Sequence, residues 1–311
     1  MRKWFACAVA CAVCACISAP QKSADSSTAT IATDAANAPP HSACAAGALA
    51  FVRAHNLCVQ ALQQFASRGS AELRWKDEQG DHFEQAQIEL AWRDGGERMA
   101  LRADKLGERI AWAGADSTQW WIFEPKSEPS RLIIGARGMV PSGSALPFAG
   151  PESVMELLAA RAWPENAQCV QGQSQESETQ TQTKNSCCVQ WSLAKPIGAW
   201  TSSRAWVQQP GALPVRIELL NVQGGVIASS ELSRPLSVQV DGVPQGAWPD
   251  IAGTTQLRMS EGGGRWNIFW DAPGTNAERL KDRLFDLAVL REVMRPQQVR
   301  DLRDVGENSV P

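Results

Sequence analysis

The chain has 311 residues, 44% of them hydrophobic, and a formal net charge of -3. The hydrophobic share is ordinary for a globular protein, and the length suits one large domain or two small ones. Without residues 1–15, which contain Arg2 and Lys3, 28 basic residues face 33 acidic ones and the formal charge is -5. This balance excludes the basic surface that nucleic-acid binding requires.

The N-terminus has the pattern of an export signal. Two basic residues precede a short apolar run that ends at Ala15, whereas a transmembrane helix needs roughly 20 apolar residues. The run closes on Val13-Cys14-Ala15-Cys16, which resembles a bacterial lipobox, in which the cysteine is diacylated and becomes the mature N-terminus. We therefore expect a lipoprotein signal peptide at 1–15 and lipid attachment at Cys16. The alternative is an ordinary cleaved secretory signal, and both outcomes export the protein.

The next segment lacks the composition of a folded domain. Residues 16–42 contain mainly Ser, Ala, Thr and Pro, and such a segment cannot bury enough surface to offset its chain entropy. We expect a flexible tether over 16–42, a folded domain over 43–295 and a C-terminal tail over 296–311.

The first half of the domain begins with a helix and continues with strands. Residues 43–67 predict a helix because apolar residues recur at helical spacing and Gly69 follows. The period then switches to two, which indicates antiparallel strands joined by turns. The expected strands are 71–75, 88–92, 99–103, 109–113, 119–124 and 131–135. A loop rich in Gly, Ser and Pro follows at 138–150, and a short helix is expected at 151–162.

The second half of the domain also alternates between strands and turns. The expected strands lie around residue 169 and at 189–193, 205–207, 215–219, 226–232, 256–259 and 266–270. A final amphipathic helix is expected at 276–295. Together these elements predict an α+β protein with a large curved antiparallel sheet, an unclosed half-barrel, covered by helices.

Five cysteines follow the lipobox, and export favours their pairing. Cys169 and the Cys187-Cys188 pair flank a polar tract at 171–186, so these three residues are disulfide candidates. Cys44 and Cys58 cannot bond within one straight helix, since the fourteen residues between them span about 21 Å.

The sequence shows no catalytic or cofactor motif. The three His are dispersed, and it lacks a Gly-x-Ser-x-Gly elbow, a His-Glu-x-x-His pair and a phosphate loop. We expect no enzymatic activity, no cofactor and no metal site. The enzymatic alternative, an envelope hydrolase, would need two carboxylates brought together by the fold.

Three stretches resemble the LolA/LolB-like superfamily of periplasmic lipoprotein-carrier proteins. They are a helix leading into Gly69–Trp75, the run Glu108–Pro125 with its aromatic pair, and Leu213–Leu219 with the Gly-centred turn that follows. The resemblance covers most of residues 45–270. It implies an unclosed barrel with helices plugging its mouth, and an apolar ligand. The membrane-anchored member of the superfamily is itself a lipoprotein, which agrees with Cys16.

The expected strands carry a set of large apolar residues. Each buried methylene contributes about 0.8 kcal/mol, so such a set can hold a fatty chain without polar contacts. We expect these residues to line a cavity for acyl chains; the alternative is that they form the core of the domain itself. The set comprises Leu73, Trp75, Ile88, Leu90, Trp92, Ile110, Trp112, Trp121 and Phe123.

These observations predict a membrane-anchored periplasmic lipoprotein that binds acyl chains or lipidated proteins, with a role in lipoprotein sorting. It would face the periplasm from a bacterial membrane, with the outer membrane favoured because Ile17, rather than Asp, follows Cys16. The alternative is a non-enzymatic interaction or stress-sensing lipoprotein with a closed core, which acts through its loops and the 171–186 insertion.

Overall fold

The computed structural model describes residues 40–77, 80–139, 150–170, 186–208, 213–260, 264–276 and 280–303. The expected signal peptide, Cys16 and almost all of the expected tether lie outside these ranges. Most of the 138–150 loop and of the polar insertion also lie outside them. Among the described residues, no helix has the length and apolar character needed to cross a membrane.

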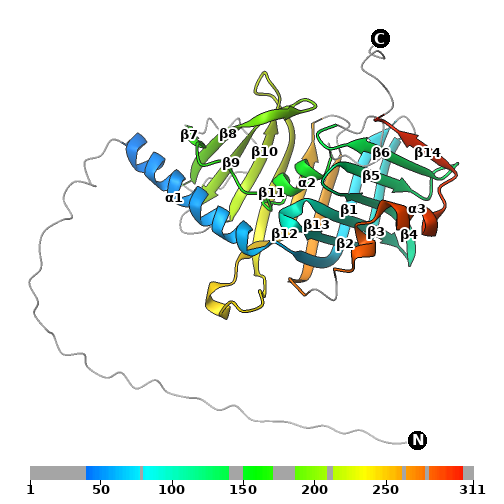
Figure 1. Ribbon diagram of the computed structural model, residues 1–311. Helices are drawn as coiled ribbons and strands as arrows, with labels where there is room; N and C mark the ends of the chain where they lie inside the picture. The colour runs from blue at the N-terminus through cyan, green and yellow to red at the C-terminus, as the bar shows by residue number, and fades with distance from the viewer. Residues whose placement is uncertain are drawn as a thin grey trace, which may run out of the picture. The chain divides into compact units, whose positions relative to one another are not determined.

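The folded part consists of one large sheet with three α-helices (Figure 1). The helices are α1 (Pro40–Ala61), α2 (Pro151–Leu157) and α3 (Leu287–Met294), with short 3-10 turns η2 (Asp94–Gly96), η3 (Gln245–Ala247) and η5 (Asp282–Leu284). The strands are β1 (Phe65–Asp77), β2 (Gly80–Arg93), β3 (Arg98–Lys105), β4 (Glu108–Ala115), β5 (Gln119–Glu124), β6 (Arg131–Ala136), β7 (Gln168–Val170), β8 (Ser186–Ile197), β9 (Trp200–Gln208), β10 (Pro214–Leu220), β11 (Val226–Ser237), β12 (Asp250–Met259), β13 (Arg265–Gly274) and β14 (Gln298–Asp301).

The strand order is β14-β6-β5-β4-β3-β2-β1-β13-β12-β11-β10-β9-β8-β7. Each neighbouring pair is antiparallel except β14 and β6, which are parallel. The pairing of β1 with β13 joins the first meander to the second. The edge strands β14 and β7 do not pair with each other, so the sheet is not closed. The expected α+β fold with an unclosed antiparallel half-barrel is therefore confirmed.

Close contact between β1 and β13 depends on a glycine. A Cβ atom on Gly69 would lie 2.1 Å from the carbonyl oxygen of Phe269, which no larger residue could tolerate without a backbone shift. Gly69 therefore lies inside β1 rather than after a helix. The expected helix over 43–67 is too long at its C-terminal end, because β1 already starts at Phe65.

The two faces of the sheet are covered by different parts of the chain. One face packs against α1 and α2 in the largest apolar cluster, and it includes Phe65, Trp92 and Met99, which are paired side by side at one end of three adjacent strands. Successive residues of a strand point to opposite faces. The chain neighbours of these three pack instead against Leu280 and Phe285. Figure 1 shows α1 lying across the sheet from β7 and β8 toward β12.

Two other expected elements are shorter than the pattern predicts. The helix expected at 151–162 ends at Leu157, because Ala159 adopts a positive φ of 56° that ends helical hydrogen bonding. The helix expected at 276–295 is divided into η5 and α3, and Asp286 between them caps α3 by accepting hydrogen bonds from two backbone amides.

The boundaries of the domain also differ from expectation. The first helix begins at Pro40, three residues before the expected start of the domain. The expected tail is not wholly outside the fold, because β14 pairs with β6 and Leu302 is buried. The strand β14 has four residues, and most of their side chains are exposed. Such a strand has no hydrophobic alternation from which it could be predicted.

Candidate functional site

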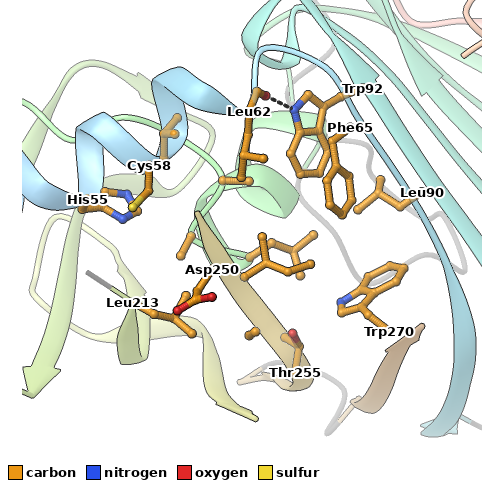
Figure 2. Close-up of a pocket in the computed structure, with 16 residues that line it drawn as sticks. His55, Cys58, Leu62, Phe65, Leu90, Trp92, Leu213, Asp250, Thr255 and Trp270 are labelled. Atoms are coloured by element: carbon orange, nitrogen blue, oxygen red, sulfur yellow. Dashed lines mark hydrogen bonds between the residues drawn. The ribbon is translucent and has the colours of Figure 1, made fainter. Parts of the chain in front are cut away.

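An apolar pocket lies between α1 and the sheet (Figure 2). The second half of α1 forms one wall, the segment after α2 forms another, and β1, β2, β12 and β13 form the floor. The lining residues are His55, Cys58, Val59, Leu62, Phe65, Leu90, Trp92, Leu158, Ala159, Ala160, Leu213, Asp250, Ile251, Ala252, Thr255 and Trp270.

Aromatic residues of β1 and β2 fix one end of the pocket. Phe65 and Trp92 stack with ring centroids 4.0 Å apart. The Trp92 Nε1–H donates a hydrogen bond of 2.8 Å to the carbonyl of Leu62, just after α1, as Figure 2 shows. The end of α1 is thereby tied to the sheet at the pocket.

The pocket is small in this conformation. Its volume is about 30 Å³, on the order of two water molecules, whereas pockets for small-molecule ligands have about 300–1,000 Å³. An acyl chain can therefore enter only if α1 or the segment 158–160 moves away from the sheet.

Polar groups are few, and most of them lie at one end of the pocket, where Figure 2 shows His55, Cys58 and Asp250 together. Burial raises the pKa of the Cys58 thiol, and the negative charge of Asp250 raises it further. Deeper in the pocket, Thr255 is fully buried, and its hydroxyl has no hydrogen-bond partner among the described residues.

Side chains of α1 hold the segment that follows α2. The Asn56 side chain donates from Nδ2 to the carbonyl of Trp163 and accepts from its backbone N–H, both at 2.8 Å. His55 stacks on the Trp163 ring with centroids 4.0 Å apart, and its Nε2 lies 3.0 Å from the carbonyl oxygen of Arg161. These contacts join two walls of the pocket.

Solved structures with the same architecture include proteins of three bacteria. A LolA superfamily protein of Nitrosomonas europaea superposes with a TM-score of 0.51 at 12% identity, and a DUF1329 family protein of Desulfovibrio piger with 0.52 at 11%. A domain of Vibrio parahaemolyticus, assigned to an outer membrane lipoprotein-sorting protein, gives 0.50 at 9%. Each match covers 78% of this chain and 98% of the other.

The chain has a LolA/LolB-like fold. At these identities the likeness concerns the fold alone, and the resemblance seen in the sequence is confirmed at that level. No protein-family model matches the sequence, and no curated protein matches it.

The LolA/LolB-like sheet divides the nine expected cavity residues between its two faces. Five of them belong to the cluster beneath α1 and α2, namely Leu73, Ile88, Leu90, Trp92 and Ile110. Only Leu90 and Trp92 line the pocket in this conformation. Contact of the other three, Leu73, Ile88 and Ile110, with a ligand stays a prediction.

Four of the nine do not lie in this cluster. Trp112, Trp121 and Phe123 pack against Leu290 of α3 on the other face. These three therefore lie on the face away from α1 and α2, since Trp120 and Ile122, which alternate with Trp121 and Phe123 along β5, point the other way. That they contact a ligand stays a prediction. Trp75 is 37% exposed and stacks on His82 near the β1–β2 turn.

Of the three disulfide candidates, Cys169 is disulfide-bonded, but not to Cys187 or Cys188. The Sγ atoms of Cys169 and Cys187 lie 3.3 Å apart, well beyond the S–S bond of about 2.05 Å. Cys188 points to the opposite face, where burial raises the pKa of its thiol to about 12. Cys58, on α1, is a free thiol.

The sequence did not reveal the helix side of the site. His55, Asn56 and Cys58 lie in an ordinary helical pattern, and Asp250 follows a loop. The available signal was that His55 and Asn56 are polar residues on the buried side of α1. Buried polar groups require hydrogen-bond partners, so these two indicated contacts with another segment.

Proposed function

We propose that this protein is an exported lipoprotein, anchored through Cys16, that binds acyl chains or lipidated proteins between α1 and the sheet, with a role in lipoprotein sorting. The observation that carries the proposal is the apolar pocket that α1 covers on an open-edged sheet. A ligand chain that replaces α1 side chains against Leu90, Trp92 and Trp270 keeps this surface out of water. Each methylene it buries contributes about 0.8 kcal/mol.

The periplasmic face of a bacterial membrane is the proposed location, with the outer membrane favoured over the inner one. The lipobox-like Val13-Cys14-Ala15-Cys16 and the absence of Asp after Cys16 support it. Mass spectrometry of the N-terminal peptide tests this part. We expect acyl mass on Cys16 and loss of membrane attachment in Cys16→Ser. A mature chain that starts beyond Cys16 would contradict it.

Ligand binding is tested with a fluorescent C16 fatty acid and the purified chain. In Ala252→Leu the larger side chain projects into the pocket, so a bound ligand would overpack the site, and overpacking costs about 1–3 kcal/mol. We therefore expect the ligand affinity to fall by about tenfold or more. Ala288→Leu, on the exposed side of α3, is the matched control and should bind like the wild type.

A wild-type chain that takes up no fatty acid and carries no co-purified lipid would contradict the proposal. Equal affinity of Ala252→Leu and wild type would move the binding site away from this pocket.

A further inference from the structure

A buried carboxyl group precedes, in the sequence, the segment 158–160 that forms one wall of the pocket. Glu156, in the last turn of α2, is 1% exposed. Its Oε2 lies 3.9 Å from Nη1 of Arg161, and the Ser203 hydroxyl donates a hydrogen bond to the carboxyl group. Oε1 of Glu156 and Nη1 of Arg161 have no hydrogen-bond partner among the described residues. The negative charge of an ionised Glu156 would therefore be only partly balanced by Arg161 and the Ser203 hydroxyl.

The elements packed around Glu156 offer it one positive charge. From β9 it meets Ser203, whose hydroxyl also accepts from Nε1 of Trp200 at 3.1 Å. The residues of β10 on the same face are the apolar Ile217 and Leu219.

The charged side chains of β9, β10 and the start of α2 are paired elsewhere. On the far face of β9 and β10, Arg204 and Arg216 contact Glu218. At the start of α2, Glu152 pairs with Arg137 at 2.8 Å. On α1, Nε2 of His55 lies 3.0 Å from the backbone carbonyl oxygen of Arg161. Arg161 is therefore the one charged side chain described next to Glu156.

The pocket wall is hydrogen-bonded to the turn that contains Glu156. The amide of Ala159 donates to the carbonyl of Glu156 at 2.9 Å, and that of Ala160 to the carbonyl of Met155 at 2.8 Å. Leu158, Ala159 and Ala160 line the pocket. A displacement of Glu156 toward water therefore displaces the wall.

We propose that Glu156 is the proton-controlled latch of the pocket: its ionisation favours a conformation in which segment 156–161 leaves the sheet and the pocket admits a ligand. This inference concerns the regulation of the site proposed above, and its ligand-binding part rests on that proposed function.

The direction of the effect follows from burial. Desolvation raises the pKa of Glu156 from 4.5 to about 7, although Arg161 and Ser203 lower it in part. In an open conformation the carboxyl group reaches water and its pKa returns toward 4.5. The closed state is therefore most stable when Glu156 is protonated, and it loses stability as pH rises from 4.5 through 7.

Hydrogen exchange of the full chain, followed by mass spectrometry and corrected for intrinsic pH dependence, tests the latch without any ligand. Between pH 5 and pH 8 we expect the opening constant of peptides that cover 154–163 to rise by more than about tenfold. In Glu156→Gln this rise should disappear. Glu165→Gln, which removes an exposed carboxylate nearby, is the matched control and should behave like the wild type.

A second variant separates a latch from a merely structural role. In Arg161→Gln the positive neighbour is lost, so the pH midpoint of opening should move to a higher value. Exchange that is independent of pH, or a pH dependence that survives in Glu156→Gln, would overturn the proposal.

Uptake of the fluorescent C16 fatty acid, measured in parallel, distinguishes the two proposals. Faster uptake at pH 8 than at pH 5, absent in Glu156→Gln, supports both. Uptake with pH-independent exchange overturns the latch alone. Latch behaviour without uptake at either pH overturns the proposed function and the ligand-binding part of this inference.

Discussion

At the scale of single residues, Trp92 shows how one side chain can belong to both core and site. Its ring stacks on Phe65 inside the largest apolar cluster, while its indole N–H holds the carbonyl of Leu62. A buried carbonyl that loses its donor costs about 1–3 kcal/mol. The position therefore contributes to stability and fixes the end of α1.

Trp92→Phe should lower the free energy of unfolding by about 2 kcal/mol, because it leaves the Leu62 carbonyl without its donor. Denaturant titration measures this value. Trp75→Phe, at a 37% exposed position, serves as control and should change stability far less. If both substitutions lowered the free energy of unfolding equally, the indole hydrogen bond of Trp92 would not contribute to stability as argued.

Glu156 should make global stability depend on pH. Because burial raises its pKa from 4.5 to about 7, its contribution is fully present below pH 4.5 and is lost as pH rises through 7. Relative to Glu156→Gln, the wild type should lose on the order of 2–3 kcal/mol between pH 4.5 and pH 8. Urea titrations of both chains across this range test it; a constant difference would refute the burial argument.

At the scale of elements, polar side chains add specific contacts to the apolar packing that holds the described part of α1 on the sheet. Asn56 makes two hydrogen bonds to the backbone of Trp163, and Trp92 holds the end of the helix. The sequence predicts the helix but not this role, because a polar residue at helical spacing gives no sign of a partner 107 positions away. Periodicity reports burial of a face, not which segment covers it.

Asn56→Ala should loosen α1 from the segment after α2. Loss of two partly buried hydrogen bonds leaves a carbonyl and an amide of Trp163 without their side-chain partner, which costs about 1–3 kcal/mol. Hydrogen exchange of α1 amides should accelerate accordingly. Gln60→Ala, on the exposed side of the same helix, is the control. Unchanged exchange in Asn56→Ala would exclude the clamp.

The helix on the opposite face depends on its cap. Asp286 accepts from the amides of Ala288 and Val289 at 2.8 and 3.2 Å. Asp286→Ala should therefore destabilise the protein by about 1 kcal/mol without changing fatty-acid affinity, since α3 does not line the pocket. Thermal unfolding and ligand titration check both parts. A drop in affinity would couple α3 to the site.

At the scale of the whole molecule, the alternating pattern predicts the architecture well and the site incompletely. Period-two alternation identifies the strands and their antiparallel arrangement. It cannot decide which of the two apolar faces of β4 and β5 looks toward α1, and the structure places Trp112, Trp121 and Phe123 on the face that packs against α3. The strand β14 escapes prediction because its four residues are mostly exposed.

The central claim is that ligand chains enter between α1 and the face of the sheet that carries Trp92 and Trp270. The chain has 13 tryptophans, whose indole N–H signals are resolvable by NMR and assignable by Trp→Phe substitution. A fatty acid with a nitroxide at its tail should broaden the signals of Trp92 and Trp270 and leave those of Trp112 and Trp121, on the opposite face, intact. Broadening of Trp112 and Trp121 alone, or of no tryptophan, would contradict the account.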